Sequence, residues 1–207
     1  MSLDMVFVIL IIIFSAIVHE VMHGVAADRL GDPTARYAGR LTLNPIPHID
    51  LYGSIIVPVF LTLVHSPVFF AWAKPVPYNP YNLRPGRFSE AIVAAAGPFS
   101  NIVIALLTGA IIRLAGLGAE INSVLLLIVV VNVMLCIFNL IPVPPLDGSK
   151  VLESFLPRSL QYGYQAWRHS LERNPVFGMM LVLLFIYVFG GQFGDFVYSI
   201  ASKIAGI

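Results

Sequence analysis

The sequence is poor in charge: of its 207 residues only 11% are Asp, Glu, Lys or Arg, whereas soluble domains carry about 25%. The formal net charge of +1 offers no basic surface for nucleic acid, so no nucleic-acid partner is expected. The single cysteine, Cys136, excludes an intrachain disulfide. The first residues lack the basic stretch and cleavage site of a signal peptide, so we expect the first apolar run to be retained.

Hydrophobic residues make up 58% of the chain, and the mean hydropathy is +0.86. A soluble core cannot use this much apolar surface, which predicts an all-α, multi-pass integral membrane protein in contact with the lipid bilayer. The apolar segments that are candidates for membrane burial are 5–27, 52–73, 88–114, 121–141 and 175–200. No stretch is long enough for a separate soluble domain, so we expect a single membrane-embedded domain over residues 1–207, of undetermined oligomeric state.

Basic residues gather in the connectors between these segments, for example Arg29, Arg40, Lys74 and Arg158. By the positive-inside rule these connectors are cytoplasmic, and the turn between the third and fourth segments is external. Both ends of segment 52–73 then lie inside, which predicts a re-entrant hairpin, with a full span as the alternative. Gly190-Gly191 is a candidate break in the last segment.

Residues 29–50 have a different pattern. Gly31-Asp32-Pro33 is a turn signal, and the alternation from Tyr37 to Asn44 favours extended structure over helix. We therefore expect a small β-hairpin or ribbon in this region.

The first apolar segment ends in the motif His19-Glu20-Val-Met-His23. Two histidines four residues apart lie on one face of a helix and can bind one metal ion, while Glu20 between them can accept a proton from water. Ionisable residues are costly in a membrane span and are usually functional there. The alternative is a cluster of polar residues that faces the lipid headgroups, and we favour the metal site.

A catalytic zinc usually has three protein ligands, and the best candidate for the third is Asp147. It follows the fourth segment, whose end shares the cytoplasmic side with the histidines in the predicted topology. Prolines before Asp147 end the helix, and Gly148 after it permits a sharp turn. An ordinary Asp-Gly turn is the alternative for Asp147. His48 and His65 are weaker candidate ligands, since an imidazole is as often a hydrogen-bonded structural group.

The fourth segment also carries Asn132, Cys136 and Asn139, whose spacing places them on one helical face. Asn139 could donate a hydrogen bond to a peptide carbonyl or a developing oxyanion, or it could join helices or cap one. In the third segment Gly97-Pro98 favours a kink among small residues, and Asn101 either lines a cavity or bonds a neighbouring helix.

These motifs together resemble the site-2 protease family of intramembrane zinc metalloproteases. The resemblance rests on His19-Glu-Val-Met-His23, Gly97-Pro-Phe-Ser-Asn101 and the stretch from Phe138 to Gly148, and it covers about two-thirds of the chain. No segment of the chain is long enough for a PDZ-like insertion, and in this respect the chain is similar to the compact prokaryotic members.

The resemblance implies one Zn²⁺ per chain bound by His19, His23 and Asp147, with Glu20 as the general base and Asn139 binding the substrate or transition state. It also implies a core of three transmembrane helices (the first, third and fourth segments), peripheral helices and a membrane-associated β-ribbon. The expected substrates are transmembrane-helix proteins, and the expected location is a prokaryotic cell membrane with the active site toward the cytoplasm.

The rival interpretation is a metal-binding membrane protein without protease activity, either a zinc carrier or a pseudoprotease regulator. A carrier is expected to show inverted repeats and broken helices, and the sequence has no such symmetry. Glu20 distinguishes the two, because a zinc protease requires this carboxylate and a carrier does not.

Overall fold

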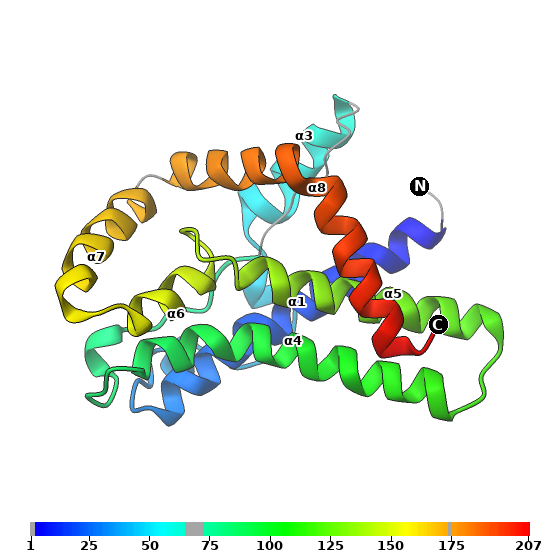
Figure 1. Ribbon diagram of the computed structural model, residues 1–207, viewed down its shortest axis with the longest axis horizontal. Coiled ribbons are helices and arrows are strands. Elements are labelled where there is room, and N and C mark those ends of the chain that lie inside the picture. Colours follow the sequence, from blue (N-terminus) through cyan, green and yellow to red (C-terminus); the bar gives the residue numbers. More distant parts are fainter. Residues whose placement is uncertain (1–2, 65–72, 174) are drawn as a thin grey trace. The chain divides into compact units, whose positions relative to one another are not determined.

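The computed structural model describes residues 3–64, 73–173 and 175–207. Within these ranges the regular structure is helical (Figure 1). The chain divides into two compact units, Met1–Leu83 and Arg84–Ile207. The expectation of a single metalloprotease domain over residues 1–207 stays a prediction.

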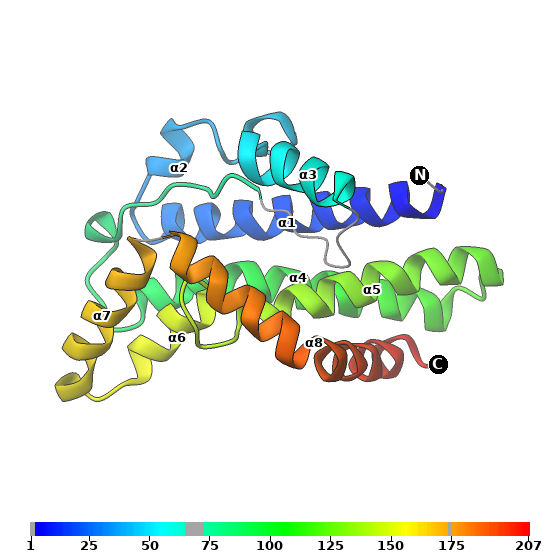
Figure 2. The same ribbon diagram turned by 90° about the horizontal axis from the view of Figure 1, so that it is seen from above.

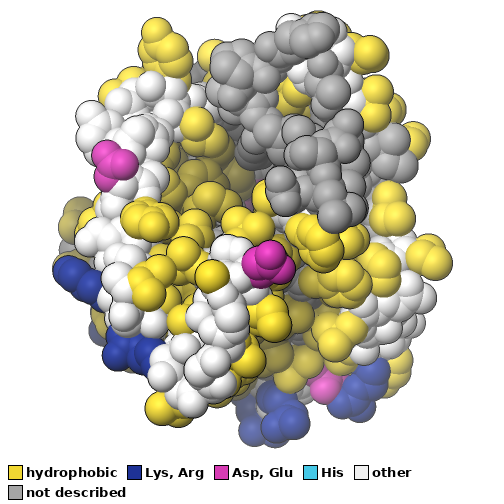
Figure 3. All heavy atoms as spheres, turned by 90° about the vertical axis from the view of Figure 1, so that its right-hand side faces the viewer, with side chains coloured by type: hydrophobic (Ala, Val, Ile, Leu, Met, Phe, Trp, Pro, Cys, Tyr) yellow, Lys and Arg dark blue, Asp and Glu magenta, His cyan; other side chains and the backbone are white. Residues whose placement is uncertain are grey.

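Long apolar helices dominate both units: α1 (Leu3–Arg29), α4 (Ser89–Leu114), α5 (Ala119–Asn139) and α8 (Pro175–Ala205). In the described part of the chain, 4 helices are long and apolar enough to cross a membrane. They coincide with four of the predicted segments, and hydrophobic side chains are widespread among the described residues on the face in Figure 3. The chain is therefore a multi-pass membrane protein.

The first unit combines α1 with short helices: α2 (Thr34–Tyr37), η1 (Ile46–His48), η2 (Leu51–Ile56), α3 (Val57–Leu63) and η3 (Pro80–Asn82). In Figure 2 the non-helical chain before η3 runs beside α1. The predicted re-entrant segment 52–73 begins with the short apolar helix Leu51–Leu61. Its proposed turn, with His65 and Pro67, lies outside the described residues.

The predicted β-ribbon over residues 29–50 is not confirmed. This segment is described throughout and contains α2 and η1 but no strand. The side chain of Asp32 accepts hydrogen bonds from the backbone N–H and the hydroxyl of Thr34, and the N–H groups of Tyr37 and Ala38 then bond to carbonyls four residues back. Such local bonds favour a turn that leads into a helix over pairing between strands.

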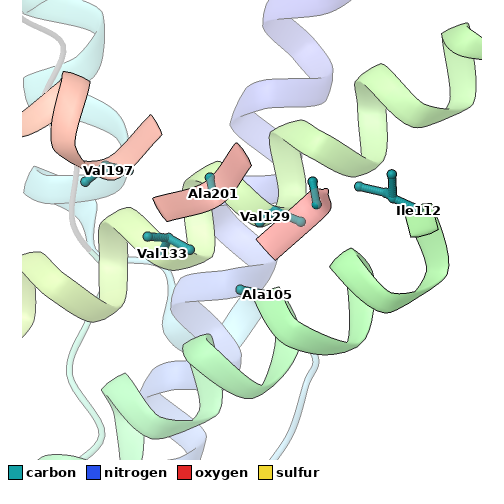
Figure 4. Packing of buried hydrophobic residues seen from close by; sticks show 7 residues of the cluster. Ala105, Ile112, Val129, Val133, Val197 and Ala201 are labelled. Carbon is teal, nitrogen blue, oxygen red and sulfur yellow. The ribbon is translucent and has the colours of Figure 1, made fainter. Parts of the chain in front are cut away.

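In the second unit α4 and α5 pack against each other, and α8 contacts both (Figure 1). Their buried side chains are small or β-branched: Ala105, Ile112, Val129, Val133, Val197, Ala201 and Ala205 (Figure 4). Small residues let helix backbones come close, and a Cβ added to Gly109 would lie only 2.8 Å from the carbonyl oxygen of Ile204. The predicted core consisted of the first, third and fourth segments, whereas these packed helices are α4, α5 and α8. The predicted core is therefore not confirmed.

The fifth predicted segment corresponds to α8, which is one continuous helix that changes direction in its orange-to-red part (Figure 1). Gly190-Gly191 therefore does not divide it into two helices.

Two peripheral helices, α6 (Asp147–Phe155) and α7 (Arg158–Glu172), complete the second unit. Arg168 of α7 is 3% exposed and donates hydrogen bonds to Glu153 of α6, Glu90 of α4 and Glu172. Burial alone would lower the pKa of Arg168, but the three carboxylates outweigh it and raise the pKa. This cluster attaches α7 to α4 and α6.

Candidate metal centre

The histidine pair lies in the second half of α1, the helix that the apolar run predicted. His19 and His23 are 6% and 8% exposed, and their ring centroids are 4.6 Å apart in an edge-on arrangement. They share one helical face because they are four residues apart. Neutral imidazole nitrogens are favoured zinc ligands, so this buried pair fits two positions of a zinc site.

Glu20, the next residue along α1, is half-buried, and its carboxylate Oε2 accepts a hydrogen bond from the backbone N–H of Val76 at 2.9 Å. Val76 was not predicted from the sequence as part of the site. The available signal was the pair Pro75 and Pro77 on either side of it, because proline has no N–H to donate.

Asp147, the predicted third ligand, is the first residue of α6 in the second unit. The next residue, Gly148, was predicted to permit a sharp turn, but it is not among the glycines with positive φ. A Cβ there would lie 2.2 Å from the carbonyl oxygen of Leu140. The glycine thus permits two backbone segments to meet beside Asp147. The approach of Asp147 to the histidines of the first unit stays a prediction.

Asn139 is the last residue of α5, and its Nδ2 donates to the carbonyl of Leu135, 2.9 Å away on the same helix. Asn132 and Cys136, on the same face, are buried. Asn132 accepts a 2.9 Å hydrogen bond from Asn101 of α4, so Asn101 joins two helices, which was one of its two predicted roles. The role of Asn139 toward a substrate stays a prediction.

His48 has a structural environment. It is 2% exposed, its Nε2 lies 2.9 Å from the carbonyl oxygen of Thr42, and its own carbonyl accepts from the N–H of Lys74. These contacts fit the hydrogen-bonded interpretation of this imidazole. His65, the other weak candidate ligand, lies outside the described residues.

The described geometry thus supplies two imidazoles and an oriented carboxylate within consecutive turns of one helix. This arrangement can hold a metal ion and can transfer a proton beside it, which are the two functions that metal-assisted hydrolysis needs.

Comparison with known proteins points to the same chemistry. Residues 114–182, which include Asn139 and Asp147, match the family model described as Peptidase family M50. The chain is 33% identical over 202 residues to "Putative zinc metalloprotease YwhC" of Bacillus subtilis (strain 168), covering 93% of this chain and 84% of that protein.

Two further relatives carry the same description. "Putative zinc metalloprotease Rip2" of Mycolicibacterium smegmatis is 30% identical over 146 residues, which are 70% of this chain and 55% of Rip2. A protein of Methanocaldococcus jannaschii is 26% identical over 169 residues, 82% of this chain and 75% of its own length. No solved structure matches the chain.

Proposed function

The chain belongs to peptidase family M50, the site-2 protease family, and we propose that it is an intramembrane zinc protease. It hydrolyses peptide bonds in or near the transmembrane segments of membrane proteins. The observation that carries this proposal is the buried pair His19 and His23 with Glu20 between them, on a helix apolar enough to span a membrane. The family membership and the zinc in the relatives' names support it.

In this proposal one zinc ion per chain is held by His19, His23 and Asp147, two imidazole nitrogens and one carboxylate oxygen. That donor set, with one position left for water or substrate, is typical of catalytic zinc. When bound, the metal polarises a carbonyl and makes water acidic enough to lose a proton near neutral pH.

The chain's own residues carry out the remaining steps. Glu20 accepts the proton of the attacking water and then delivers it to the leaving amine, as a general base that becomes a general acid. Asn139 has a second amide N–H besides the one directed to Leu135, and this N–H donates to the substrate's carbonyl oxygen.

The proposed location is a prokaryotic cell membrane with the site toward the cytoplasm. The relatives come from bacteria and an archaeon, and the basic connectors favour this orientation. Water then reaches Glu20 from the cytoplasmic side, which is where α1 ends.

The test is cleavage of single-span reporter proteins by the purified protein in detergent, comparing wild type with Glu20→Gln at equal zinc content. General acid–base catalysis contributes about 10²–10⁴-fold, so the variant should lose activity by about that factor. Glu120→Gln is the matched control, since Glu120 is an exposed residue of α5 that undergoes the same chemical change.

Equal cleavage by wild type and Glu20→Gln would contradict the proposal. If neither cleaves while each binds one zinc, the carrier or pseudoprotease becomes the better explanation, and zinc flux into liposomes would then be measured.

A further inference from the structure

A proline-rich strap crosses the helix that carries Glu20. The strap, residues 73–79, has no regular structure and contains Lys74-Pro75-Val76-Pro77. Because Pro75 and Pro77 have no N–H, Val76 supplies the one backbone donor from 75 to 77. That donor is directed to Oε2 of Glu20 at 2.9 Å.

The strap is held at both ends. Before Val76, the N–H of Lys74 donates to the carbonyl of His48 at 2.9 Å, and Nη2 of Arg40 donates to the carbonyl of Lys74 at 2.7 Å and to that of Pro75 at 3.3 Å. After Val76, the N–H of Asn79 donates to Asp32 at 2.6 Å. Arg40 and Asp32 are buried.

The side chain of Val76 also fixes the strap. It is 5% exposed and packs over Gly24, the residue that follows His23. A Cβ at Gly24 would lie 2.8 Å from Cγ1 of Val76 and 2.7 Å from Cδ2 of Leu41. A glycine at this position therefore lets the strap lie directly on α1, one turn from Glu20.

We propose that the strap is a positioning element for catalysis: the N–H of Val76 holds Oε2 of Glu20, so that Oε1 faces the water to be deprotonated. The inference rests on the proposed function of Glu20 as the base. A glutamate side chain has several rotatable bonds, and one fixed donor selects a single orientation before substrate arrives.

The alternative is a latch that blocks Glu20 until it opens. Opening would break the bonds of Lys74, Arg40 and Asn79 and expose Val76, all at once. Such a firmly attached segment suits a permanent part of the site.

The first experiment compares Val76→Pro, which removes the N–H, with Val76→Ala, which keeps it and trims the side chain. Proline fits an extended segment that already has proline on both sides. A misplaced catalytic group costs up to about 100-fold, so Val76→Pro should lower kcat about 10- to 100-fold. KM and zinc per chain should not change, and Val76→Ala should keep most of kcat.

A second measurement does not require Val76→Pro to fold. Amide hydrogen exchange at Val76 should be about tenfold faster in Glu20→Ala than in wild type, because the amide loses its acceptor. Glu120→Ala should leave that rate unchanged.

The outcomes separate the two proposals. A wild type that cleaves no reporter would overturn the proposed function and the positioning role with it. Cleavage by wild type together with an unchanged kcat in Val76→Pro, or a raised one as a latch requires, would overturn the positioning role alone. Unchanged exchange at Val76 in Glu20→Ala would also overturn it.

Discussion

The two units are stabilised in different ways. In the first, backbone N–H groups of the irregular segment 73–79 donate to carboxylates: Asp32 accepts from Asn79, and Glu20 accepts from Val76. In the second, the long helices α4, α5 and α8 meet through small apolar side chains.

The reason lies in where the backbone hydrogen bonds go. A transmembrane helix satisfies its own amides, so what remains for contact between helices is side-chain packing. Irregular segments such as 73–79 have no such internal partners, and a buried N–H without an acceptor is costly. Polar side chains in the first unit therefore position the backbone, and one of them is the proposed catalytic base.

The largest effect is expected where two backbones touch in the second unit. In Gly148→Ala the new Cβ would lie 2.2 Å from the carbonyl oxygen of Leu140, so main chain must move. Overpacking against backbone should cost about 3 kcal/mol or more of unfolding free energy and displace Asp147. Thermal unfolding in detergent and zinc per chain measure the two effects.

Gly118→Ala is the matched control, since nothing lies within 4 Å of a Cβ there and its φ is −64°. If Gly148→Ala has the same unfolding free energy as Gly118→Ala, close backbone packing is not what stabilises the second unit, and this contrast with the first unit is wrong.

An intermediate effect is expected for Asp32 in the first unit. Asp32→Asn weakens the acceptor of the N–H of Asn79, the side-chain amide of Asn82 and two donors of Thr34. Because hydrogen bonds to a charged group contribute about 1.5–3 kcal/mol, we expect a loss of about 2 kcal/mol in unfolding free energy. Asp50→Asn, which alters a local cap on η2, should cost less.

The same variant should change the dependence of stability on pH. Burial alone would raise the pKa of Asp32, but hydrogen bonds from Thr34, Asn82 and Asn79 outweigh it and lower the pKa below 3.8. Because the pKa of Asp32 is lower in the folded state, its ionised carboxylate stabilises the fold at pH values above the pKa of the unfolded state. This stabilisation is lost as the pH falls through the pKa of the folded state. The unfolding free energy of Asp32→Asn should therefore fall less steeply with decreasing pH than that of wild type. Identical pH profiles of the two proteins would contradict this prediction.

The smallest effect is expected for the polar contact between helices of the second unit. Asn101→Ala removes the 2.9 Å hydrogen bond to Asn132. Such bonds in membranes average about 0.6 kcal/mol, so the unfolding midpoint should fall slightly. Ser100→Ala, whose hydroxyl bonds within its own helix, is the control. If Asn101→Ala loses as much unfolding free energy as Asp32→Asn, polar contacts stabilise both units equally, which would contradict the contrast between them.

Parts of the structure could be predicted from the sequence. Four of the apolar segments are helices, and His19 and His23 lie together on one of them. The β-ribbon was predicted from a turn signal, from alternation and from the family resemblance, but the local hydrogen bonds of Asp32 favoured a helical turn at residues 34–37. The cluster around Arg168 was also missed, because its carboxylates lie on three different helices.

The sequence by itself determined the membrane character, the helix that carries the histidines and the family, because hydropathy, a four-residue spacing and motif order are local properties of the chain. The tertiary structure alone decided that the N–H of Val76 meets Glu20, 56 positions earlier, and that Gly148 lets the main chain at Leu140 lie against it. Contacts between distant segments depend on the backbone's path through space, which no local pattern encodes.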